Sequence, residues 1–245
     1  MAAVHTFKYQ NARVLARRTL QFFGWRILPG ALLPVILVVG LVLSVFATST
    51  SAEGQWRAAE HALWVEGDVQ KARVLYESVL EDWPASSVAG EAHAGIALLL
   101  EMDKSPSPRI AKEYATAARL SPENSKAGDW WIASGNHWQV SGDNFAAQQA
   151  YEMGIERHPT DADRARLALA NLQLAQGEID LALELFQTVA SANSSSLTSV
   201  ARMGISVCYE RMGDLDSALA ELDDSEAQWS ERRNRMVQRS EANRH

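Results

Sequence analysis

The residue types that most often carry chemistry are few and widely separated in this chain of 245 residues. Its only cysteine is Cys208, so neither an intrachain disulfide nor a cysteine-based zinc cluster can form. No two histidines have metal-ligand spacing; they stand at His5, His61, His93, His137, His158 and His245. His137 directly precedes Trp138, which is typical of a packed helical position. We therefore expect no metal site.

Other signatures of catalysis are missing as well. The sequence contains no GxSxG nucleophile motif, no phosphate-binding P-loop and no GxGxxG dinucleotide motif. Carboxylates are plentiful, but no pair stands out from those that ordinarily solvate helix surfaces. We predict that the protein is not an enzyme, has no catalytic residues and uses no cofactor. An enzyme that uses an acidic groove is a remote alternative, so function should rest on a binding surface.

The elements that would present such a surface are helices in a repeat. No strand-like alternation appears after residue 53. Instead a glycine and an acid are followed by an alanine and then by an aromatic residue or leucine. This motif occurs four times: Gly67-Asp68…Ala72…Tyr76, Gly142-Asp143…Ala147…Tyr151, Gly177-Glu178…Ala182…Phe186 and Gly213-Asp214…Ala218…Leu222. The last three glycines are 35 and 36 residues apart, and the first gap of 75 residues is about two units. Such a period predicts a solenoid of helix pairs.

The repeat resembles the tetratricopeptide repeat, a helix–turn–helix unit of about 34 residues. The best match is 128–161, where Trp131, Gly135 and Trp138 fit the large–small–large series of the first helix and Pro159 ends the second. The resemblance implies an all-α, right-handed helical solenoid over 48–230, with repeats at 53–86, 88–122, 128–161, 163–196 and 199–230. The repeat at 88–122 is degenerate, because its turn at 104–108 has no glycine. Small residues should let helices approach closely at Gly135, Ala170, Ser206, Ala147, Ala182 and Ala218.

In tetratricopeptide arrays the first helices of the pairs line a concave groove that holds a peptide or a partner protein. The resemblance places the following side chains in the partner-binding groove: Arg57, His61, Trp64, Ile132, Asn136, Gln139, Leu167, Asn171, Leu174, Met203, Val207 and Glu210. Asn136 and Asn171 match the amides that hold the main chain of an extended peptide in many family members. The basic clamp of the chaperone-binding members is absent, because its positions carry Ile132, Ala168, Val200 and Gly204. The groove would receive a peptide or pack on a permanent subunit.

An apolar segment precedes the repeats. Residues 27–47 are 21 residues without a charge, and a helix of that length spans about 30 Å, the thickness of the bilayer core. Residues 1–26 carry five basic side chains and no acid, a charge of +5. Because positive flanks stay on the side of insertion, we expect a basic cytoplasmic segment at 1–26, a transmembrane helix at 27–47 and the remainder across the membrane. A cleaved signal peptide is the main alternative, although signal cores are shorter, and a mitochondrial presequence is another.

Charge is unevenly distributed along the rest of the chain. Residues 48–230 hold 13 basic and 28 acidic side chains, a net charge of −15 that would repel nucleic acid. Residues 231–245 hold five basic side chains and two acids, and we expect a basic C-terminal capping helix or tail there.

The predicted function is a membrane-anchored scaffold that contacts partner proteins through its solenoid and the lipid bilayer through 27–47. The expected location is a bacterial inner membrane with the repeats in the periplasm; a mitochondrial membrane is less favoured. The layout resembles the ancillary repeat protein of the bacterial secretion translocon. The alternative is a permanent accessory subunit of a respiratory, photosynthetic, secretion or envelope complex. The sequence leaves the partner and the oligomeric state open.

Overall fold

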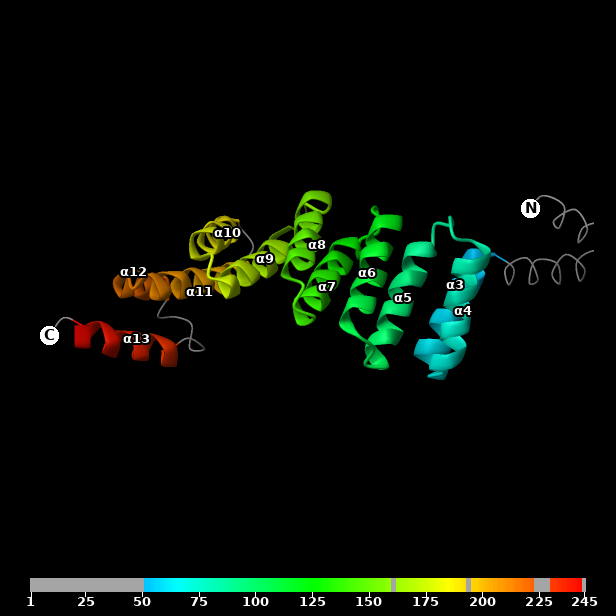
Figure 1. Cartoon of the computed structure of the whole chain (residues 1–245), viewed down its shortest axis with the longest axis horizontal. Helices are drawn as coiled ribbons and strands as arrows, with labels where there is room; N and C mark the ends of the chain where they lie inside the picture. Colours follow the sequence, from blue (N-terminus) through cyan, green and yellow to red (C-terminus); the bar gives the residue numbers. More distant parts are fainter. Residues whose placement is uncertain (1–50, 160–161, 193–194, 223–229, 244–245) are drawn as a thin grey trace, which may run out of the picture. The chain divides into compact units, whose positions relative to one another are not determined.

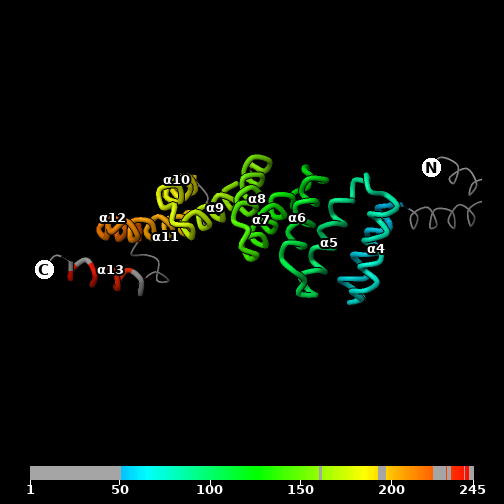
Figure 2. Tube along the Cα trace, viewed as in Figure 1, coloured from blue at the N-terminus to red at the C-terminus, as the bar shows by residue number. Residues whose placement is uncertain are grey.

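The computed structural model describes residues 51–159, 162–192, 195–222 and 230–243, and Figures 1 and 2 show them as a series of helices. They belong to the second of two compact units, Met1–Thr50 and Ser51–His245. The segments predicted at 1–26 and 27–47 lie outside the described residues. Within the described ranges, none of the helices has both the length and the apolar character needed to cross a bilayer. All regular secondary structure in these ranges is helical, which confirms the all-α prediction.

The helices follow one another as antiparallel pairs joined by short turns. The first pair is α3 (Ala52–His61), continued by the π-helix η1 (Ala62–Glu66), and α4 (Val69–Asp82). It is followed by α5 (Ala89–Met102) with α6 (Ser107–Leu120), α7 (Ala127–Val140) with α8 (Asn144–Arg157), α9 (Ala162–Gln176) with α10 (Ile179–Ser191), and α11 (Ser195–Met212) with α12 (Leu215–Ala220). The last helix is α13 (Ser230–Asn243). Each helix from α3 to α13 packs on the next one along the chain, and α7 also packs on α9.

The recurring glycine–acid dipeptide has a physical explanation in the turn inside each pair. Gly142 follows the end of α7 and has a φ of +84°. This left-handed conformation is unfavourable in free energy for a residue that has a side chain, and glycine has none. The next residue, Asp143, begins α8 by accepting a hydrogen bond of 3.0 Å from the backbone amide of Ala146. Gly67-Asp68 and Gly213-Asp214 make the same turn. In the degenerate turn, Lys104 takes the left-handed conformation with a φ of +53°.

Aromatic rings of the second helices lie against glycines of the first helices, and this contact sets the spacing of the stack. A Cβ atom at Gly135 would stand 2.3 Å from the ring of Tyr151. The same relation, at 2.4 and 2.5 Å, holds for Gly95 with Tyr76 and for Gly204 with Phe186. All three rings are buried. The expectation that small residues mark close helix crossings is therefore confirmed at Gly135, and Ala147, Ala182, Ala218, Ala170 and Ser206 are fully buried as well.

Enlarging a buried alanine should destabilise the stack. Ala147 packs beside Tyr151 and Ala182 beside Phe186, and both alanines have no exposed surface. Ala147→Leu or Ala182→Leu should lower the free energy of unfolding of the 51–245 unit by about 1–3 kcal/mol, because the extra carbons have no space. Thermal denaturation of that unit measures the effect. An unchanged melting temperature would show that these alanines do not lie at close crossings.

The last helix packs on the end of the stack. Met236 of α13 is buried against Ala218 and Leu222, and the hydroxyl of Ser206 also points to its sulfur, 3.9 Å away. Arg239 of α13 donates a hydrogen bond to Glu210 of α11. Met236 therefore lies on the face of α13 that packs on the stack.

Candidate functional site

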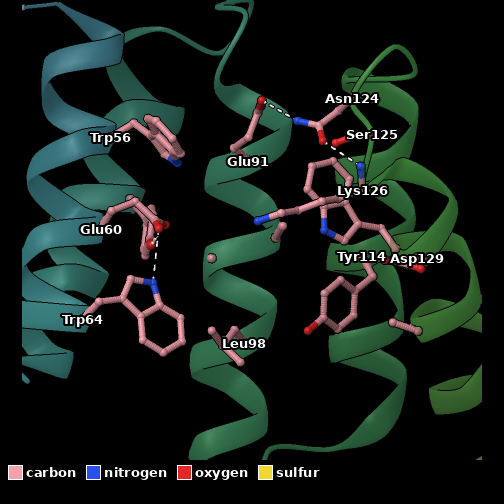
Figure 3. Close-up of a pocket in the computed structure, with 15 residues that line it drawn as sticks. Trp56, Glu60, Trp64, Glu91, Leu98, Tyr114, Asn124, Ser125, Lys126 and Asp129 are labelled. Carbon is pink, nitrogen blue, oxygen red and sulfur yellow. Dashed lines mark hydrogen bonds between the residues drawn. The ribbon is translucent and has the colours of Figure 1, made fainter.

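A cavity of about 520 Å³ lies between the first helices of the first three pairs (Figure 3). Its first wall consists of Trp56, Glu60 and Trp64, which are spaced four residues apart and therefore share one face of α3 and η1. The π-helix η1 carries Trp64, and π-turns of this kind are often found at functional sites. Trp64 is 67% exposed, so its indole remains available to a ligand.

The other walls come from α5, α6 and α7. Helix α5 contributes Glu91 and Leu98, with the small residues Ala94 and Gly95 between them. Figure 3 shows Glu91 and Leu98 between Trp56, Glu60 and Trp64 on one side and Tyr114, Lys126 and Asp129 on the other. Trp130 and Ala133 of α7 complete that far side. Because Ala94 and Gly95 are small, an open space remains between the aromatic side chains of the walls.

Three carboxylates line the cavity against one lysine. Glu60 accepts hydrogen bonds from the Trp64 indole, at 3.1 Å, and from the Tyr76 hydroxyl. Glu91 accepts from the Ser121 hydroxyl at 3.1 Å and from the Asn124 amide at 2.7 Å. All these donors are neutral, and among the described residues neither glutamate forms an ion pair.

The third carboxylate is compensated differently. Asp129 of α7 forms an ion pair with Arg164 of α9. Lys126 lines the cavity from the start of α7 and is the only basic residue among its lining residues. The lining therefore carries more negative than positive charge, and the excess comes from Glu60 and Glu91.

Polar groups of the aromatic side chains add to this character. Burial raises the pKa of Tyr76, and its hydrogen bond to Glu60 raises that pKa further, so the phenol stays a donor. Burial and the nearby charge of Glu101 raise the pKa of Tyr114. The Trp56 indole N–H is buried and has no acceptor among the described residues. The cavity thus offers aromatic faces, two carboxylates without an ion pair and one unused donor, which suit binding of a polar or cationic group.

Of the residues that the sequence placed on the first repeat's groove, only Trp64 lines this cavity. Arg57 is exposed and forms an ion pair of 2.9 Å with Glu53, one turn earlier on the same helix. His61 is also exposed, and its Nδ1 lies 3.2 Å from a carboxylate oxygen of Glu66. These two side chains interact with neighbours on their own helical segment, because they stand one residue beyond the cavity-facing positions.

Two of the three groove residues predicted on α7 bond to Tyr151 of their own pair, and the third packs on a cluster that also includes α9. Asn136 is exposed, and its side-chain oxygen accepts a hydrogen bond of 2.8 Å from the Tyr151 hydroxyl. Gln139 accepts from the same hydroxyl at 3.2 Å. Ile132 is half-buried against the cluster that contains Leu169. Burial raises the pKa of Tyr151 to about 12, which keeps this hydroxyl protonated.

On α9 the structure differs from the sequence prediction. Leu167 and Leu174 are each only 8% exposed and pack in the cluster that contains Phe186 and Ile205. They contribute to the core instead of an open groove, because the neighbouring helices α10 and α11 cover them. Asn171 is exposed, as a groove residue should be.

The predicted residues of α11 lie beside the C-terminal helices. Met203 packs against the cluster of Ala218, Leu222 and Met236, and Val207 packs partly against the cluster around Phe186. Glu210 accepts its hydrogen bond from Arg239 of α13. The twelve predicted residues therefore do not form one site, and only Trp64 among them lines the cavity at α3, α5 and α7.

Comparison with known proteins supports the repeat in the C-terminal part of the chain. The family model described as "Tetratricopeptide repeat" matches residues 139–196 and 167–232. Residues 139–232, less than half of the chain, therefore resemble tetratricopeptide repeats. No curated protein matches the sequence closely enough to suggest more.

Solved structures share the same fold at low sequence identity. The crystal structure of MamA is 20% identical with a TM-score of 0.54, and the match covers 66% of this chain and 89% of that one. YrrB, described as a tetratricopeptide repeat protein with an unusual peptide-binding site, is 18% identical with a TM-score of 0.55, covering 75% and 93%. BtubC from P. vanneervenii is 16% identical with a TM-score of 0.56, covering 81% and 83%. At these identities the likeness shows the fold alone.

The cavity lies outside the part of the chain that carries the matched tetratricopeptide repeats. Its lining residues run from Trp56 to Ala133, whereas the family match begins at residue 139. Sequence reasoning missed most of them, namely Trp56, Glu60, Glu91, Leu98, Tyr114, Lys126, Asp129 and Trp130. One signal could have found the first wall: Trp56, Glu60 and Trp64 recur at intervals of four residues, so two large aromatics share a helix face with an acid. Among the described residues, no cluster of histidine, cysteine and acidic side chains could hold a metal ion.

Proposed function

We propose that this protein is a membrane-anchored scaffold that holds a segment of a partner protein on the inner helices of its tetratricopeptide solenoid. The observation that carries the proposal is the cavity of about 520 Å³ with Trp56, Trp64 and Trp130 in its walls. Close-packed protein interiors leave no space of this size, and ligand cavities fall in the range of about 300–1,000 Å³. The peptide-binding site named for YrrB, which has the same fold, supports a peptide as the occupant.

The anchor is the second part of the proposal. Residues 27–47 would span the bilayer and the +5 charge of residues 1–26 would keep the N-terminus in the cytoplasm, so the repeats would lie in the periplasm of a bacterial cell. A scaffold tethered only a few residues from the bilayer would concentrate its partner beside the membrane, because tethering raises the effective concentration.

Protease accessibility tests the anchor and its orientation. In sealed spheroplasts, added protease should digest residues 48–245, while a cytoplasmic marker protein stays intact. The chain should also remain with the membrane fraction after osmotic shock. Release of the repeats by osmotic shock would indicate a cleaved signal peptide, and protection from protease would indicate the opposite orientation.

Loss of two amides should weaken the contact with the partner. Asn136 and Asn171 are exposed on the first helices α7 and α9, where their side chains could bond to the main chain of a bound segment. Because losing a partner from a buried hydrogen bond costs about 1–3 kcal/mol, Asn136→Ala with Asn171→Ala should reduce the affinity about tenfold or more. Gln139 remains as an acceptor for the Tyr151 hydroxyl, so folding should be preserved. Quantitative mass spectrometry of protein that co-purifies from membranes in mild detergent measures the loss.

The matched control for this experiment is Glu184→Gln. Glu184 is exposed on the outer helix α10, and this variant should retain the partner at the wild-type level. If the double variant and the control retain the partner protein equally, the inner helices are not the contact surface.

A second candidate function, a permanent subunit contact, is favoured by a different observation. Large apolar side chains are exposed at the turn inside the pairs, including Val65 at 71%, Val140 at 77% and Phe145 at 72%. The other members of this group, which we call the turn edge, are Met102, Leu181 and Met212. Stacking of repeats brings equivalent turns to one face of a solenoid. An apolar edge of this kind fits a subunit that stays bound.

A further inference from the structure

We propose that the cavity at α3, α5 and α7 binds an arginine or lysine side chain of an extended partner segment, an inference that rests on the proposed scaffold function. The shape of the cavity and the side chains that line it support this proposal. Trp56 and Trp64 of the first helical segment and Trp130 of α7 all line one space of about 520 Å³. Tryptophan is the best aromatic partner for a cation, and a guanidinium group can stack on its face.

The charge of the lining favours a cation over a neutral or acidic group. Glu60 and Glu91 have only neutral hydrogen-bond donors among the described residues, and Asp129 is already compensated by Arg164. Lys126 opposes the two glutamates from the α7 side and is outnumbered by them. A second cation would therefore be attracted, whereas an acidic side chain would meet both glutamates in a partly dehydrated space.

The unused donor points to a peptide as the bearer of that cation. The Trp56 indole N–H is buried without an acceptor in the described part of the chain. A main-chain carbonyl of a bound segment would supply the missing acceptor, and burying such a donor unpaired is costly. The net charge of −15 over residues 48–230 would also attract a basic segment from a distance.

The test uses the full-length chain in detergent and a displayed library of random short peptides as the probe. Peptides that bind should be enriched in arginine or lysine at one position of the selected motif. Replacing that residue with norleucine should weaken binding about tenfold, because a desolvated cation–π contact has about that effect. Binding should also weaken as salt concentration rises, since the glutamates contribute through charge.

Two variant pairs connect the binding to the cavity. Trp64→Leu removes an exposed indole from the wall and should weaken binding of the selected peptides about tenfold. The control is Phe145→Leu, which changes a similarly exposed aromatic side chain on α8 and should leave the affinity unchanged. Glu91→Gln should weaken basic peptides and reduce their salt dependence, whereas Glu184→Gln on α10 should not.

The outcomes separate this inference from the proposed function. Peptides that need Trp64 but show no basic enrichment would overturn the inference and leave the scaffold function standing. If no peptide binds, or if Trp64→Leu leaves the affinity unchanged, both this inference and the proposal that the inner helices bind the partner would be wrong. Basic peptides that bind only after deletion of residues 1–26 would mean that the chain's own basic segment is the occupant, which would overturn the assignment to a partner.

Discussion

A single methyl group added at Gly204 should lower the free energy of unfolding by about 1–3 kcal/mol. Its Cβ would stand 2.5 Å from the ring of Phe186, which is buried between α10 and α11, so the ring or the helix would have to shift. Alanine is ordinarily the better helix former, by about 1 kcal/mol over glycine, so helix propensity predicts the opposite sign. A unit of this size should lose about 2–4 °C in melting temperature for each kcal/mol.

A double-mutant cycle assigns this effect to the ring. Phe186→Leu alone should also destabilise the unit, because a smaller side chain leaves a cavity. In the double variant the leucine leaves room for the new methyl group, so the two losses should sum to less than their separate values. The expected coupling is about 0.5–3 kcal/mol, measured by denaturant unfolding of residues 51–245.

Gly154 of α8 provides a milder comparison. A Cβ atom there would lie 3.3 Å from the Cβ atoms of Ala165 and Trp131, so Gly154→Ala should destabilise less than Gly204→Ala. If Gly204→Ala were neutral and showed no coupling to Phe186→Leu, the packing of α10 on α11 would differ from the structure.

The sequence was sufficient for the fold of the repeats because their constraints are local. The left-handed turn at Gly142, the cap at Asp143 and the buried alanine at Ala147 all lie within six residues, and each residue type has one dominant structural use. A turn without glycine was harder to interpret, yet Lys104 adopts the same left-handed conformation. The pair is retained there, with α5 packed on α6 as in the other pairs.

The candidate site was less predictable, because it depends on contacts between pairs. The resemblance to tetratricopeptide repeats transferred groove positions residue by residue. It could not foresee that α10 and α11 cover Leu167 and Leu174, nor that Arg239 of α13 reaches Glu210. The cavity is lined by residues of α3, α5 and α7, and its first and last lining residues are about two repeats apart in sequence. A local sequence pattern cannot predict which residues meet over that separation.

Photo-cross-linking tests the binding face most directly, since it separates the inner cavity from the turn edge. Trp64 lines the cavity and Phe145 lies on the turn edge; both are large, exposed aromatic side chains that can be replaced by p-benzoylphenylalanine with little effect on folding. Each variant of the full chain would be irradiated in living cells, and adducts would be identified by mass spectrometry. Because the reactive group captures only groups in van der Waals contact, each position reports its own surface.

We expect a defined protein adduct from Trp64→p-benzoylphenylalanine, mapped to one segment of the partner, and no comparable adduct from Phe145→p-benzoylphenylalanine. An adduct that forms at position 145 and not at position 64 would contradict binding at the inner cavity, because the partner would then lie along the turn edge as a permanent subunit.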